Sequence, residues 1–175
     1  MKETQKLEQA TADGFLILYN AEHGTDYRVV RIAGEGESPD VYCMDSGGGL
    51  LNLEVTLTQD RPKDIAAAYG RSDTRSLDYL KQNVENVAKG LEAPLFSTIE
   101  GVSETLVERI KAKLIKSYGS DVALVVRDSS GVDWEWDTVM PQFRAKLDLS
   151  SRNPFDRGIW ILSRSKSRMF RIDQD

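Results

Sequence analysis

The sequence has few residues that could build a disulfide or a soft-metal site. It contains one cysteine, Cys43, and one histidine, His23. A single cysteine cannot form an internal disulfide, and these two residues are too few for a zinc site. Because nothing in this composition points to a disulfide-stabilised secreted protein, we expect a cytoplasmic one.

Long apolar runs are also missing. The longest, residues 15–19 and 159–162, are far shorter than the ~20 residues that a membrane helix needs. Residues 1–14 are charged and amide-rich, which is unlike a signal peptide. With 40% hydrophobic and 29% charged residues, the 175-residue chain is typical of a folded domain. We therefore expect one domain over residues 1–175 and no membrane partner.

Charge is unevenly distributed along the chain. Residues 152–171 include six Lys or Arg and one Asp, so this segment carries +5 and the rest carries −10 of the total of −5. A basic stripe of this kind suits a phosphate backbone, although a basic hairpin that balances an acidic surface explains it equally well.

The first half of the chain predicts one helix and three strands. Leu7, Thr11, Phe15 and Leu18 form one stripe of a helix over residues 2–20, and Gly24 is a plausible left-handed cap. Strands are predicted over residues 27–32, 40–44 and 50–57, the last two separated by a Gly-rich turn.

The second half alternates helices with strands. We predict helices over residues 63–69, 77–90, 103–118 and 136–147, and strands over 121–127, 158–163 and 169–172. The apolar strand 121–127 is expected to lie parallel to the strand 50–57. The fold class is α/β, with a mixed central β-sheet flanked by helices in the order α-β-β-β-α-α-β-α-β-β.

Two carboxylates are brought together by the predicted hairpin of residues 38–57. A turn centred on Gly47 pairs residues whose numbers add up to 94, which places Asp40 opposite Glu54. Two carboxylates this close repel each other unless a cation lies between them, and Mg²⁺ suits carboxylate oxygens. The alternative is a half-exposed strand whose polar residues, Asn52, Glu54 and Thr56, simply face solvent.

This segment resembles the PD-(D/E)xK nuclease superfamily, which has the restriction-endonuclease-like fold. The resemblance lies in Pro39-Asp40, the following hairpin, and Glu54-Val55-Thr56, and the order of elements from residue 2 to about 147 is similar as well. It implies that Asp40, Glu54 and the carbonyl of Val55 are metal ligands. The superfamily often adds an acidic residue from the first helix, for which Glu8 and Glu22 are the candidates; we favour Glu8.

The chain departs from the superfamily pattern at Thr56, which occupies the catalytic position of the motif lysine. A threonine hydroxyl supplies no positive charge, and the loss of a charged stabiliser can cost orders of magnitude in rate. Some members of the superfamily replace or relocate this lysine. Arg28, Arg31, Gln59 and Lys63 are candidates for its replacement, and the sequence does not choose among them.

The resemblance implies a nuclease that uses Mg²⁺ or Mn²⁺ to hydrolyse phosphodiester bonds of DNA. In that function the basic residues Arg164, Lys166, Arg168 and Arg171 would bind the nucleic-acid backbone. A homodimer that cuts both strands is an open alternative to a monomer. Two other functions remain open: an inactive relative that acts as a binding or assembly module, and an unrelated α/β regulatory domain that binds a protein partner.

Overall fold

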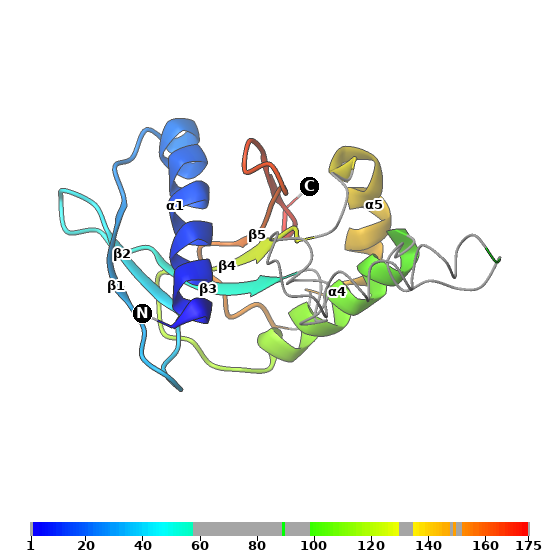
Figure 1. Cartoon of the computed structure of the whole chain (residues 1–175), viewed down its shortest axis with the longest axis horizontal. Coiled ribbons are helices and arrows are strands. Elements are labelled where there is room, and N and C mark those ends of the chain that lie inside the picture. The colour runs from blue at the N-terminus through cyan, green and yellow to red at the C-terminus, as the bar shows by residue number, and fades with distance from the viewer. Residues whose placement is uncertain are drawn as a thin grey trace.

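The computed structural model describes residues 2–57, 89, 99–129, 135–147, 149 and 152–174. Within these residues the chain forms three helices and a six-stranded mixed sheet (Figure 1). The helices are α1 (Glu3–His23), α4 (Ile99–Leu114) and α5 (Trp136–Lys146). The strands are β1 (Arg28–Ile32), β2 (Val41–Met44), β3 (Asn52–Leu57), β4 (Val122–Arg127), β5 (Ile159–Leu162) and β6 (Met169–Arg171).

The strands follow one another across the sheet in chain order. Strands β1, β2 and β3 are antiparallel, β3, β4 and β5 are parallel, and β6 returns antiparallel to β5. The predicted parallel pairing of the strands over 50–57 and 121–127 is therefore confirmed. The fold is therefore of the α/β class with a mixed central sheet, as predicted. The helices predicted over residues 63–69 and 77–90 lie outside the described residues.

The sheet is covered on both faces. Helix α1 packs on one face, where Phe15 and Leu16 belong to the same apolar cluster as Leu53 and Val125. Helices α4 and α5 pack on the other face, and Figure 1 shows them on the opposite side of the strands from α1. Every residue of β4 is buried, as predicted for its apolar sequence, because alternate side chains point into the two clusters.

The boundaries of α1 and α4 differ from the predictions by about one turn, whereas α5 agrees with its prediction to within one residue. Helix α1 continues to His23, and Gly24 ends it in the left-handed conformation (φ 64°, ψ 35°), which confirms the predicted cap. Helix α4 begins at Ile99 and ends at Leu114, whereas the prediction runs over residues 103–118. Tyr118 leaves the helix and is buried nearby.

The register of β2 and β3 is the predicted one. Val41 pairs with Leu53, and Met44 forms a bridge to Leu50. The residue numbers of each pair add up to 94. The alternative in which the polar residues of the third strand face solvent is wrong for Asn52 and Glu54, because both are buried on the α4 side of the sheet.

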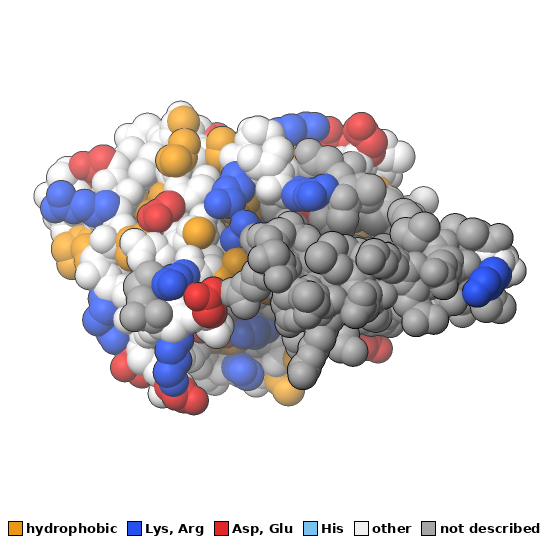
Figure 2. Space-filling view, in the orientation of Figure 1, with side chains coloured by type: hydrophobic (Ala, Val, Ile, Leu, Met, Phe, Trp, Pro, Cys, Tyr) orange, Lys and Arg blue, Asp and Glu red, His pale blue; other side chains and the backbone are white. Residues whose placement is uncertain are grey.

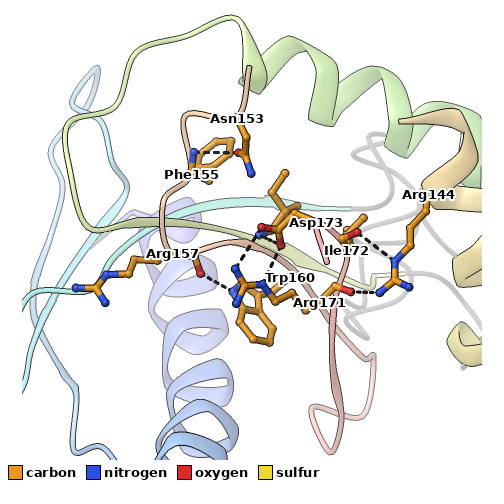
Figure 3. Close-up of polar contacts among 9 residues, drawn as sticks. Arg144, Asn153, Phe155, Arg157, Trp160, Arg171, Ile172 and Asp173 are labelled. Atoms are coloured by element: carbon orange, nitrogen blue, oxygen red, sulfur yellow. Dashed lines mark hydrogen bonds and ion pairs between the residues drawn. The ribbon is translucent and has the colours of Figure 1, made fainter. Parts of the chain in front are cut away.

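The C-terminal strand is fastened by arginines (Figure 3). Arg144 of α5 donates to the backbone carbonyls of Arg171 (2.7 Å) and Ile172 (3.1 Å). The guanidinium of Arg171 lies over the ring of Trp160 at 5.3 Å from its centroid and pairs with Asp173 at 3.1 Å. The last strand is thus held by α5 and by the core as well as by its ladder with β5.

Among the described residues, none of the helices has the length and apolar character needed to span a membrane.

We predict that Gly158→Ala destabilises the fold by about 1–3 kcal/mol. Gly158 has a φ of +93°, and a Cβ there would lie 2.9 Å from Nε of Arg171 and 3.0 Å from Nε1 of Trp160. Urea unfolding measures the change. Gly119→Ala is the matched control, because a Cβ at Gly119 has nothing within 4 Å. Equal stability of the two variants would contradict the role given to Gly158.

Candidate functional site

The candidate site lies where β2 and β3 separate. The register of these strands places Asp40, which directly precedes β2, opposite Glu54 of β3. Oδ2 of Asp40 accepts a hydrogen bond from the backbone N–H of Val55 at 2.8 Å, so the aspartate side chain takes the place of a strand partner. In a strand, the N–H and C=O of one residue point to the same side. The Val55 carbonyl therefore lies on the side of Asp40, as the predicted ligand set requires.

Glu54 is a buried carboxylate with three donors around it. Its exposed fraction is 3%, and its Oε1 forms an ion pair with Lys113 and accepts a hydrogen bond from the hydroxyl of Tyr118 at 3.2 Å. Its Oε2 accepts a hydrogen bond from the hydroxyl of Ser38 at 3.1 Å. Burial and the neighbouring Glu54 both raise the pKa of Tyr118, so its phenol keeps the proton that it donates.

The partner lysine, Lys113, was not among the predicted replacements for the motif lysine. It lies in the last turn of α4, and its side chain is 22% exposed. The helical spacing of α4 could have pointed to Lys113. It follows Ile110 by three residues, and because Ile110 is buried, Lys113 flanks the face of α4 that packs on the sheet. The sequence could not show that this side of α4 packs against Glu54.

Glu8 approaches the same site from α1, on the opposite face of the sheet. The side chain is partly buried, and burial raises its pKa, with further contributions in the same direction from Asp40 and Glu54. Burial likewise raises the pKa of Asp40, and Glu54 adds to that shift, whereas the Val55 N–H opposes it. Lys113 opposes the shift at Glu8, and Lys113 and Lys116 oppose it at Asp40, so burial and the neighbouring carboxylates outweigh these cations. Glu22, the other helix candidate, is exposed at the far end of α1.

Thr56 lies in β3 near this site, and the structure describes two of the four candidates for the replacement of the motif lysine. Thr56 is half-buried in β3, two residues beyond Glu54 on the same face. Arg28 and Arg31 are exposed on the edge strand β1, and Arg31 pairs with Glu37 at 2.6 Å. Gln59 and Lys63 lie outside the described residues.

The predicted basic residues of the C-terminal hairpin have different surroundings. Arg168 pairs with Asp137, and Arg171 is engaged by Asp173, as described above. Arg164 and Lys166 lie in the turn between β5 and β6, where Arg164 is exposed and Lys166 is half-buried.

Asp40, Glu54 and the carbonyl of Val55 are the residues that could hold a hard divalent cation. In the described part of the chain, no three carboxylate, imidazole or thiolate groups gather closely enough to form a metal site by themselves. Mg²⁺ does not need such a cage, because it keeps several waters and often takes only one or two carboxylates. Oδ1 of Asn52, which is buried two residues before Glu54, has no hydrogen-bond partner among the described residues. A buried acceptor without a partner is compatible with a bound water or cation.

Comparison of the chain with protein-family models, with curated proteins and with solved structures gives no match.

We predict that Glu8→Gln raises the thermal unfolding midpoint at pH 7. Because the folded-state pKa of Glu8 is raised, the native state holds its proton longer than the unfolded state does. The stability contribution of Glu8 is therefore largest at low pH and falls as the pH rises above about 4.3, the value of an unperturbed glutamate. The gain in Glu8→Gln should vanish near about pH 3, where both states are protonated. Glu22→Gln is the control, and an equal gain there would contradict the electrostatic cause.

We predict that Lys113→Met destabilises the protein by about 3 kcal/mol, because it leaves the buried carboxylate of Glu54 without its cation. The double variant Glu54→Gln/Lys113→Met should lose less than the two single variants together, since a neutral amide needs no counter-ion. Urea unfolding of the four proteins gives the coupling energy, expected at about 1–3 kcal/mol. Additive losses would show that the pair contributes no mutual stabilisation.

Proposed function

We propose that this protein is a metal-dependent nuclease that hydrolyses phosphodiester bonds of DNA. The observation that carries the proposal is the juxtaposition of Asp40, Glu54 and Lys113 at the separation of β2 and β3. It supplies two carboxylates for a cation and restores, from α4, the positive charge that Thr56 cannot provide. The register of β2 and β3 places Asp40 opposite Glu54, which is the pairing expected from the resemblance to the PD-(D/E)xK superfamily.

The arrangement of elements supports a restriction-endonuclease-like fold. The first helix, α1, is followed by the antiparallel strands β1, β2 and β3, and a crossover that includes α4 then leads to the parallel strand β4. This is the order that the superfamily core is expected to have. The candidate residues come from the elements that carry the motif in that fold.

Each residue has a role in the proposed reaction. Asp40, Glu54 and the carbonyl of Val55 would hold Mg²⁺ or Mn²⁺, which lowers the pKa of a bound water and offsets the charge that develops on the phosphate. Lys113 places an ammonium beside Glu54, where it can stabilise that charge or orient the attacking water. Tyr118 and Ser38 hold the carboxylate of Glu54 in a fixed position, which limits the geometry that the water can adopt.

An inactive relative that acts as a binding or assembly module is the second candidate. The observation in its favour is that both oxygens of Glu54 already accept protein donors, from Lys113 and Tyr118 on one side and from Ser38 on the other. A carboxylate bound in this way can serve purely as a structural link between β3 and α4. Metal binding and DNA cleavage separate the two candidates.

We predict that wild-type protein binds Mn²⁺ in isothermal calorimetry and cleaves plasmid or single-stranded DNA in its presence. Asp40→Asn should lose the metal signal and at least about a hundredfold in cleavage rate, because it removes a charged ligand from the site. Glu22→Gln, which changes an exposed carboxylate of α1, should behave as wild type. Metal binding without cleavage by the wild type would favour the inactive relative, and absence of both would overturn the proposal.

We predict that Lys113→Arg keeps more cleavage activity than Lys113→Met at equal metal occupancy. Arginine retains the positive charge beside Glu54, whereas methionine keeps only the apolar length of the side chain. Single-turnover rates on labelled DNA measure the difference, and calorimetry confirms that both variants still bind Mn²⁺. Equal rates for the two variants would show that Lys113 stabilises the fold and takes no part in the reaction.

A further inference from the structure

Lys166 is held in an unusual backbone conformation at the turn between β5 and β6. Its φ is +55°, in the left-handed region that residues other than glycine seldom adopt. The turn fixes this conformation, because the N–H of Lys166 donates to the carbonyl of Ser163 at 2.9 Å and the N–H of Arg168 donates to the hydroxyl of Ser163 at 3.1 Å. The position of this lysine is therefore defined by the backbone.

The side chain of Lys166 lies across a glycine of α1. A Cβ added at Gly14 would lie 2.9 Å from Cδ of Lys166 and 3.4 Å from its Cβ and Cγ. Glycine lowers helix propensity, so a glycine in the middle of α1 is unfavourable for the helix itself. Its absence of a side chain makes room for the lysine stem. Figure 1 shows the β5–β6 turn beside α1.

The charge of Lys166 adds to that of a buried arginine. Arg127, at the end of β4, is 8% exposed and donates to the hydroxyl of Thr11 in α1 at 3.4 Å. Burial and the charge of Arg127 both lower the pKa of Lys166, and Asp13 acts in the opposite direction. Lys166 forms no ion pair with a carboxylate of the described residues, in contrast to Arg168 and Arg171. Figure 2 shows basic side chains on this face beside α1.

Lys166 packs against α1, the helix that also contains Glu8. Gly14 follows Glu8 by six residues, which corresponds to about 9 Å along the helix axis at 1.5 Å per residue. Thr11, the partner of Arg127, lies between the two positions in the sequence.

We propose that Lys166, which lies over Gly14 of α1 with Arg127 beside it at Thr11, binds a backbone phosphate of the DNA. This inference rests on the proposed nuclease function and names the residues that set the path of the strand. Contacts of this kind position the substrate and carry no sequence information. Of the four basic residues predicted to bind nucleic acid, Arg168 and Arg171 already face carboxylates, whereas Lys166 does not.

The test measures DNA binding separately from cleavage. Fluorescence anisotropy of a labelled duplex and of the same single strand is recorded with wild type and Lys166→Met, with Ca²⁺ replacing the catalytic ion. Methionine keeps the apolar stem over Gly14 and removes only the charge. We expect roughly tenfold weaker binding at low salt and a salt dependence that is smaller by about one counter-ion. Lys111→Met, which removes an exposed charge of α4, should change neither quantity.

A second pair of variants tests the geometry. Lys166→Arg should restore most of the binding, and Gly14→Ala should weaken it several-fold, because the added Cβ displaces the lysine stem. Circular dichroism confirms that each variant is folded. Unchanged affinity and salt dependence in Lys166→Met would overturn the inference, as would a wild type that does not bind DNA. If Lys166→Met binds normally while Asp40→Asn still abolishes cleavage, the nuclease function stands without this phosphate contact.

Discussion

The ion pair between Glu54 and Lys113 is the interaction on which the rest of this structure depends. It joins the central strand β3 to α4 across a buried part of the molecule. A buried charge without a partner is costly, so the buried carboxylate of Glu54 depends on the ammonium of Lys113. The pair therefore fixes how the end of α4 lies on the sheet, and it brings the ammonium of Lys113 to the place where Asp40 meets Val55.

The burial of carboxylates at this place is a cost to the folded state. Burial and mutual repulsion raise the pKa of both Glu8 and Asp40, which means that the native state holds these carboxylates under unfavourable conditions. Perturbed carboxylates of this kind gather at functional sites more often than elsewhere. A divalent cation would reverse the sign of the effect, since it favours the charged form of each ligand. The same carboxylates, Glu8 and Asp40, thus lower the stability of the folded state and are ligand candidates in the proposed function.

Much of the architecture could be predicted from local patterns. The helical stripe of α1, its glycine cap, the apolar strand β4 and the hairpin register of β2 and β3 all follow from spacing over a few residues, and each is confirmed. Boundaries of α4 were missed by about one turn, because a helix end depends on capping and packing that periodicity does not report. The solvent-facing alternative for β3 failed because Glu54 is covered by α4.

The sequence by itself placed Asp40 opposite Glu54 only on the assumption that the turn is centred on Gly47, because a Gly-rich turn can absorb a one-residue shift; the register of β2 and β3 confirms that pairing. Only the tertiary structure decided that Lys113, fifty-nine positions after Glu54, supplies the missing positive charge, and that Glu8 lies closer to the pair than Glu22 does. It also decided that Lys166 rests on Gly14 beside Arg127. Contacts between distant segments depend on how helices pack on the sheet, and the spacing of residues within one segment carries no record of that packing.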